Sequence, residues 1–97
     1  MSKEEILKKI LSNKAKIKDF GVKKIGLFGS YANGTQKDNS DIDFLVDFNH
    51  KNFDNYMDLK FFMEGLFNKK VDLVISNSLK HRLKPLILKR VIYAKGL

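Results

Sequence analysis

Residues 25–48, IGLFGSYANGTQKDNSDIDFLVDF, decide the fold of this chain. They read as an apolar strand, a Gly29-Ser30 step, a polar connector and a second strand that opens with two aspartates. Side chains alternate across a strand, so Asp41 and Asp43 point the same way, with Cα atoms about 7 Å apart, while their apolar neighbours point into a core. Two carboxylates on one edge of a buried strand predict a divalent-metal site.

The Gly29-Ser30 step predicts a phosphate cradle. Gly29 has no Cβ, so a phosphate can come close to the backbone. Ser30 is expected to cap a short helix, and the free N–H groups at the start of a helix bind anions. A phosphate cradle beside a pair of metal ligands predicts nucleotide chemistry.

The spacing of these residues matches a known signature. Gly29-Ser30, ten further residues and then Asp41 and Asp43 fit the pattern Gly-Ser-x10-Asp-x-Asp, so the chain resembles the DNA polymerase β-like nucleotidyltransferase superfamily. At 97 residues it is most similar to the minimal nucleotidyltransferase (MNT) group, whose members often pair with a HEPN-domain toxin. The likeness runs from residue 20 to about residue 75 and includes three further motif positions, Ala32, Gly34 and Ser40.

The resemblance implies a fold and a set of site residues. The fold is α/β (α+β), a small mixed β-sheet with helices mainly on one face and the nucleotide site at its open edge. Asp41 and Asp43 would hold two Mg²⁺ ions, with Mn²⁺ as the alternative, because hard oxygen ligands select these metals over zinc. Gly29 and Ser30 would bind the β- and γ-phosphates of ATP, which is the substrate. Asp72 would be the third acidic residue, on the strand beside the Asp-x-Asp strand, as a metal ligand or general base.

Two other aspartates can be judged from the residues alone. Asp72 lies inside an apolar run, where a carboxylate is costly unless it is neutralised, hydrogen-bonded or bound to metal. A structural carboxylate at a strand end is the alternative interpretation. Asp47 shares a strand face with Asp41 and Asp43, but the strand has by then run about 13 Å past Asp41. We therefore expect Asp47 at the surface or in a supporting position.

The resemblance also implies an activity. The expected enzyme is a Mg²⁺-dependent antitoxin that transfers AMP from ATP to a hydroxyl, expected to be a tyrosine, of a HEPN ribonuclease toxin and so neutralises it. Apolar residues exposed on the helix at 56–67 or on the C-terminal segment would contact the toxin. Two alternatives stay open: a non-catalytic antitoxin that masks the toxin by binding, and a small-molecule nucleotidyltransferase, although such enzymes normally carry an added domain for the acceptor.

One position departs from the family pattern. Many relatives carry a basic residue shortly after Gly-Ser, where this chain has Tyr31 and Asn33, and Lys37 is the nearest cation in sequence. We therefore expect either weaker binding of the triphosphate or a contact to the triphosphate from elsewhere in the chain.

Length and composition limit the possible classes of protein. A chain of 97 residues predicts a single domain, residues 1–97, with one modest core. No apolar run approaches the roughly 18 residues of a membrane span. The absence of cysteine and of a signal-like N-terminus predicts a cytoplasmic protein. His50 and His81 have no second soft ligand near them in sequence, so zinc is not expected.

The formal net charge of +8 is unevenly distributed. Eight lysines lie within residues 3–24 and six basic residues within residues 80–95, whereas six aspartates lie within residues 38–58. The basic ends favour solvated faces or a partner interface over direct nucleic-acid binding, because aromatic residues do not alternate with the lysines. Steering of a triphosphate is a third interpretation.

Hydrophobic periodicity predicts the remaining elements. Ser2 and Glu5 form a capping box before apolar residues at helical spacing, so we expect one amphipathic helix to about Lys18, ended near Gly21. The other expected elements are strands at 22–28, 41–48 and 69–75, a helical turn at 29–33, a polar loop at 33–40, a core-covering helix at 54–67, a capped segment at 77–83, a helical turn at 85–90 and an extended piece at 91–94.

Overall fold

The computed structural model describes residues 1–49, 53–76 and 84–96. Four strands form one sheet in the order β3-β2-β1-β4. Strand β1 is antiparallel to both β2 and β4, whereas β2 and β3 run parallel. The sheet is therefore mixed, as the sequence predicts. The strands are β1 (Val22–Phe28), β2 (Ile42–Phe48), β3 (Val71–Ile75) and β4 (Ile92–Tyr93).

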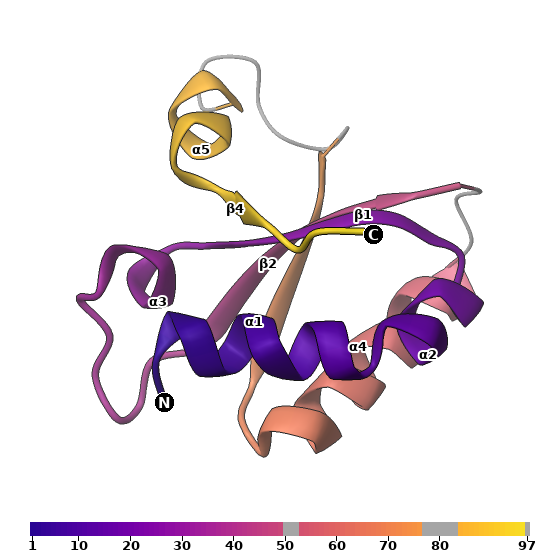
Figure 1. Cartoon of the computed structure of the whole chain (residues 1–97), viewed down its shortest axis with the longest axis horizontal. Coiled ribbons are helices and arrows are strands. Elements are labelled where there is room, and N and C mark those ends of the chain that lie inside the picture. Colours follow the sequence, from indigo (N-terminus) through magenta and orange to yellow (C-terminus); the bar gives the residue numbers. More distant parts are fainter. Residues whose placement is uncertain (50–52, 77–83, 97) are drawn as a thin grey trace.

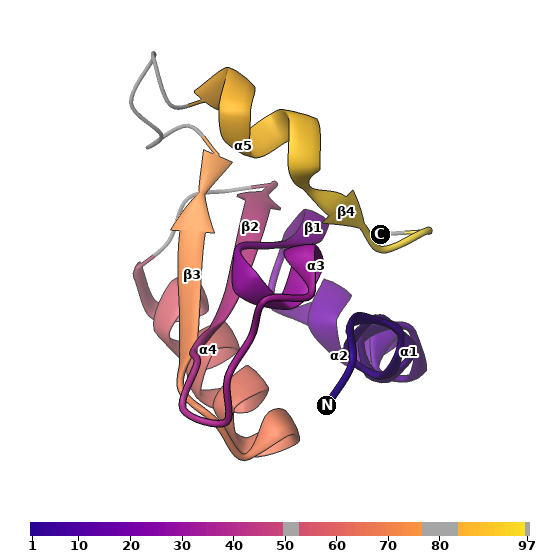
Figure 2. The same ribbon diagram turned by 90° about the vertical axis from the view of Figure 1, so that its left-hand side faces the viewer.

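Helices cover mainly one face of this sheet. Figures 1 and 2 show three of them packed on one side, while the C-terminal helix lies on the other, above the single turn that follows β1. The expected α/β arrangement is thus confirmed. The helices of the first side are α1 (Lys3–Ser12), α2 (Lys14–Asp19) and α4 (Phe53–Phe67), the turn is α3 (Ser30–Asn33), and the C-terminal helix is α5 (Lys84–Arg90).

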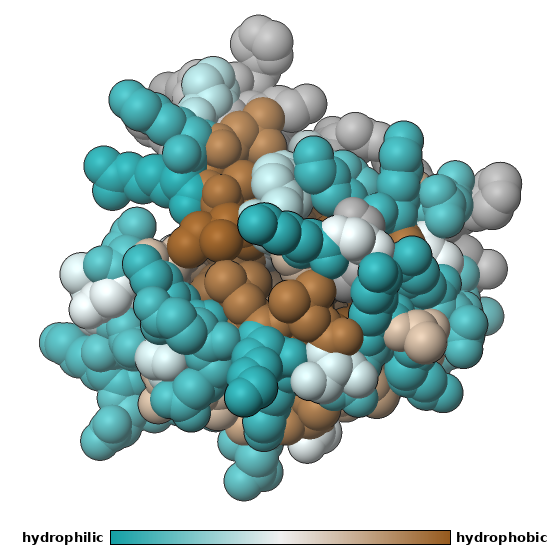
Figure 3. Space-filling model, viewed as in Figure 1, coloured by the Kyte–Doolittle hydropathy of each residue, from teal (hydrophilic) through white to brown (hydrophobic). Residues whose placement is uncertain are grey.

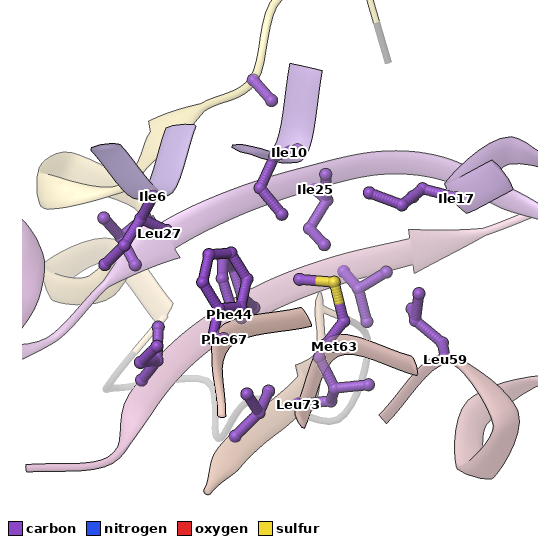
Figure 4. Close-up of a cluster of buried hydrophobic side chains, with 14 of the residues drawn as sticks. Ile6, Ile10, Ile17, Ile25, Leu27, Phe44, Leu59, Met63, Phe67 and Leu73 are labelled. Atoms are coloured by element: carbon purple, nitrogen blue, oxygen red, sulfur yellow. The ribbon is translucent and has the colours of Figure 1, made fainter. Parts of the chain in front are cut away.

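The core fills the space between the sheet and these three helices. Figure 4 shows Ile25 and Phe44 of the sheet facing apolar side chains of α1, α2 and α4. The rings of Phe44 and Phe67 stack with centroids 5.9 Å apart. Each fully buried side chain of this size contributes about 1.5–3 kcal/mol through removal from water. The labelled helical residues of the cluster are Ile6, Ile10, Ile17, Leu59, Met63 and Phe67.

The opposite face of the sheet is covered in part by the C-terminal segment. Leu45 is fully buried there without belonging to the main core cluster. A Cβ added to Gly26 would lie 2.6 Å from Val91 Cγ2 and 3.0 Å from Tyr93 Cδ1. Glycine at this position therefore lets β4 and Val91, the residue before it, come close to β1.

The N-terminal helix differs from the expected single helix. Its start is as predicted: Glu5 N donates to Ser2 Oγ at 3.2 Å and Ser2 N donates to Glu5 Oε1 at 3.3 Å, which completes the capping box. However, the helix breaks at Asn13, whose Nδ2 donates to the Lys9 carbonyl at 2.8 Å. A side-chain amide that competes for helix carbonyls in this way favours a break. The second helix ends before Gly21, which has φ +82°.

The other expected elements are confirmed to within two residues. This holds for the three longer strands, for α3 and α4, and for α5 with β4 after it. The capped segment at 77–83, His50 and His81 lie outside the described residues. None of the helices in the described ranges combines the length and apolarity needed to cross a membrane.

Candidate active site

Antiparallel pairing of β1 with β2 brings the two halves of the motif together. Phe28 lies opposite Asp43 in the register, so the next residue, Gly29, meets the Asp43 side chain. A Cβ added to Gly29 would overlap Asp43 Oδ2 and lie 3.0 Å from its Cγ. Gly29 also has φ +76° and ψ −154°, a conformation that residues with a side chain rarely adopt. Glycine is required here both by the backbone and by the room that Asp43 occupies.

The turn α3 follows directly from Gly29. The expectation that Ser30 caps this turn is wrong, because Gly29 holds the N-cap position, Ser30 is the first helical residue and no side chain makes a capping bond. Asn33 N donates to the Gly29 carbonyl at 3.1 Å and closes the turn. Tyr31 is only 2% exposed, so its ring belongs to the core rather than to the site. Ser30 is partly buried and directly follows Gly29.

Parallel pairing of β2 with β3 brings in the third carboxylate. Asp43 and Asp72 are register partners on adjacent strands, which lie about 4.8 Å apart in a sheet. Ile42 N donates to the Lys70 carbonyl at 3.1 Å and fixes the level at which both strands begin. Asp72 is exposed, whereas Asp43 is partly buried between it and Gly29. Sequence reasoning placed Asp72 on the strand beside Asp43, and the structure has it there.

A tight turn before β2 places Asp41 near Asp43 and Asp72. Lys37 N donates to Ser40 Oγ at 2.9 Å, and Ser40 N donates to the Lys37 carbonyl at 3.0 Å. Asp41 follows immediately, exposed, one residue before β2 begins. The structure thus gathers all three predicted carboxylates at one end of β2 and β3, next to Gly29 and Ser30.

The electrostatics of this group favour a bound cation. Burial, and then the negative charges of Asp72 and Asp41, together raise the pKa of Asp43 to about 6. A divalent ion among the carboxylates would relieve this repulsion, and an all-oxygen donor set suits Mg²⁺ or Mn²⁺. Throughout the described part of the chain, no three acidic or histidine side chains are already arranged to hold a metal.

A cavity of about 370 Å³ adjoins the site on the side of α3. Gly29 forms part of its wall, so the cavity opens beside the expected phosphate position. The other described residues of its wall come from β1 and α3 on one side and from α5 on the other; they are Phe28, Asn33, Ile87 and Arg90.

Comparison with known proteins gives the family. The family model for the nucleotidyltransferase domain matches residues 4–94. The chain belongs to this family.

Relatives of this nucleotidyltransferase include proteins named for AMP transfer to proteins. The protein adenylyltransferase MntA of Thermococcus cleftensis is 38% identical over 92 residues, with 93% of each chain covered. A solved structure assigned as a minimal nucleotidyltransferase superposes with a TM-score of 0.82 at 29% identity, over 95% of each chain. The structure of a toxin–antitoxin with AMP-PNP gives a TM-score of 0.74 at 28% identity and covers 94% of this chain and 73% of that one.

Sequence reasoning missed two residues near the site of the nucleotidyltransferase. Lys69 Nζ donates to the Asp38 carbonyl and ties the polar loop before Asp41 to the start of β3. Arg90 lines the cavity beside Gly29. Both residues are far from the motif in the sequence. Each has other basic residues near it, and the sequence does not indicate which of them lies close to the site.

Asp47, the third acidic residue of this face of β2, lies away from the site. It pairs with Lys24 in the register of β1 and β2. Burial, and then the charge of Asp47, raise the pKa of Tyr93, and Lys24 Nζ lies 4.0 Å from the centroid of the Tyr93 ring. Asp47 therefore belongs to a charged group beside β4 and can serve as a control for the site carboxylates.

Proposed function

We propose that this nucleotidyltransferase transfers AMP from ATP to a hydroxyl group, expected to be a tyrosine, of a HEPN-type toxin and thereby acts as its antitoxin. The observation that carries the proposal is the placement of Asp43 against Gly29 and beside Asp72. The similarity to a protein adenylyltransferase and to a toxin–antitoxin structure supports a protein as the acceptor. We place the reaction in the cytoplasm, as the cysteine-free sequence predicts.

The reaction joins the acceptor oxygen to the α-phosphorus. As that bond forms, the bond between the α-phosphorus and the oxygen bridging to the β-phosphate breaks, and pyrophosphate leaves. The Gly29 N–H and the Ser30 hydroxyl hold the β- and γ-phosphates and orient this leaving group. The exposed Asp72 carboxylate can reach an incoming acceptor, and it takes the proton from the attacking hydroxyl.

Asp41 and Asp43 have the chemistry to hold Mg²⁺. When bound, Mg²⁺ supplies positive charge that stabilises the charge on the entering and leaving oxygens. The partly buried position of Asp43 reduces its contact with water, which strengthens its attraction for a cation. Gly29, pressed against Asp43, places the phosphates beside that cation site.

The test uses the intact mass of a HEPN partner. The partner is incubated with the nucleotidyltransferase, ATP and Mg²⁺, and we expect it to gain one or more AMP units. Asp41→Asn and Asp43→Asn should lower the rate about a hundredfold or more, because each removes a charge that stabilises the transition state by several kcal/mol. Asp47→Asn is the matched control, since it makes the same change on the same strand away from the site.

The outcomes separate the possible functions. Transfer at the wild-type rate by Asp43→Asn would refute the assignment of the site. A stable complex with an inhibited toxin and no mass gain would instead support masking by binding. Fragmentation of the modified toxin locates the AMP, and its attachment to a residue other than tyrosine would contradict the expected acceptor.

A further inference from the structure

The cavity beside Gly29 extends the site beyond the residues of the motif. It lies between the end of β1, α3 and α5, and Figure 2 shows α5 standing above α3. Phe28 and Ile87 provide apolar walls, while Asn33 and Arg90 provide polar groups. None of the three site carboxylates forms part of the wall.

This geometry fixes which end of a nucleotide reaches the cavity. The α-phosphorus must lie at the carboxylates, because bond formation occurs there. Gly29 is the residue shared by the carboxylate group and the cavity. The part of the nucleotide that passes Gly29 into the cavity is therefore the β- and γ-phosphate end, which carries most of the negative charge.

That end needs a positive partner, and α3 does not supply one. Its four residues include no basic side chain. Lys69 is engaged elsewhere, since its Nζ donates to the Asp38 carbonyl. Among the described residues of the cavity wall, Arg90 is the one cation. A guanidinium stays charged at all working pH values and binds two phosphate oxygens at once.

We propose that Arg90 binds the β- and γ-phosphates of the nucleotide and the pyrophosphate product. The proposal rests on the proposed function for the position of the nucleotide on Gly29 and Ser30. Arg90 is exposed on the last turn of α5, so its long side chain can turn into the cavity without disturbing the core. It supplies from α5 the charge that α3 lacks.

Binding of two probes tests this role. Inorganic triphosphate and AMP are titrated separately, by calorimetry with Mg²⁺, into the wild-type protein and the Arg90→Gln variant. We expect Arg90→Gln to weaken triphosphate binding about tenfold or more, as loss of a charge-assisted hydrogen bond does, and to change AMP binding less than about twofold. Lys89→Gln is the matched control, because Lys89 is the exposed neighbour on α5 and lies outside the cavity wall.

Three outcomes would overturn the proposal. Equal weakening of AMP and triphosphate binding would place the adenosine in the cavity instead. Equal effects of Arg90→Gln and Lys89→Gln would reduce the role of Arg90 to general surface charge. Unchanged triphosphate binding by Arg90→Gln, with loss of affinity for a HEPN partner, would make Arg90 an interface residue.

The assay requires no transfer of AMP. If the protein binds triphosphate through Arg90 yet modifies no toxin, the proposed function fails and the role of Arg90 stands. If AMP is transferred and Arg90→Gln binds triphosphate like the wild type, the proposed function stands and the role of Arg90 fails.

Discussion

At the scale of the residue, the Asp43 carboxylate is both partly buried and close to two other negative charges. Burial, Asp72 and Asp41 raise its pKa to about 6, so the folded protein binds a proton there more tightly than the unfolded chain does. The stabilisation that this proton gives is complete at pH values below the unfolded pKa of about 4 and is lost as pH rises through the folded value. Without divalent ions, we therefore expect Asp43→Asn to have a higher Tm than the wild type at pH 8, and a difference that shrinks toward pH 4.

Thermal unfolding in EDTA at pH 4, 6 and 8 measures this difference. Solvent screening of the partly exposed carboxylate should limit the Tm difference to a few degrees. Added Mg²⁺ or Mn²⁺ should raise the Tm of the wild type and of Asp47→Asn, but not that of Asp43→Asn. If the Tm of the wild type and the Tm of Asp43→Asn changed with pH in the same way, the charge on Asp43 would not lower the stability of the protein.

Gly29 allows a second test at the same scale. Gly29 and Gly34 both have φ +76°, but a Cβ on Gly34 meets nothing within 4 Å, whereas one on Gly29 meets Asp43. We expect Gly34→Ala to cost about 1–2 kcal/mol of stability and to keep AMP transfer. Gly29→Ala should cost more and abolish transfer, because its side chain displaces the carboxylate. Denaturant unfolding and the toxin mass assay give the two readouts, and full transfer by Gly29→Ala would contradict the described contact.

At the scale of elements, the loop that precedes β2 is held by one side chain from the start of β3. Lys69 donates to the Asp38 carbonyl across this loop. We expect Lys69→Met to speed hydrogen exchange in residues 34–40 and to slow AMP transfer, with little change in Tm, because Asp41 would be less firmly placed. Lys70→Met, a change at the exposed neighbour, should do neither. Unchanged exchange in Lys69→Met would show that the turn at Ser40 holds the loop by itself.

Most elements could be predicted because their signals are local. Alternating apolar residues define β1 and β2, and the Asp-x-Asp pattern and the lone Asp72 mark two adjacent strands. The break at Asn13 depends on one side-chain hydrogen bond, which periodicity does not reveal. The N-cap at Gly29 depends on a positive φ, and Asp43 leaves no room for a side chain there from another strand. Arg90 is placed by the path of α5 over the sheet, a tertiary feature with no local signal.

At the scale of the whole molecule, apolar residues gather on one face. Figure 3 shows them over α5 and β4 and continuing toward α1, with hydrophilic residues on both sides. Leu88 of α5 is 37% exposed and Leu11 of α1 is 43% exposed. Phe61 of α4 is 60% exposed. Sequence reasoning offered both α4 and the C-terminal segment as the toxin contact.

We expect the face at α5 to receive the toxin, because α5 borders the cavity and the acceptor must reach the nearby carboxylates. Leu88→Asp should weaken binding of a HEPN partner about tenfold or more and leave triphosphate binding unchanged. Phe61→Asp should have little effect on either. Affinity measured by surface plasmon resonance decides between them, and a loss confined to Phe61→Asp would move the contact to α4.

The pairing of Phe28 with Asp43 has a consequence for how such proteins diversify. The strand ladder, and not the connecting loop, sets Gly29 against Asp43, so the part of the connector before Lys37 can change in length while this contact stays fixed. Doubling a flexible loop costs only about 0.6 kcal/mol. The segment at residues 35–36, ahead of the turn that positions Asp41, is thus a natural place for insertions, through which a lineage could acquire a new acceptor without rebuilding its chemistry.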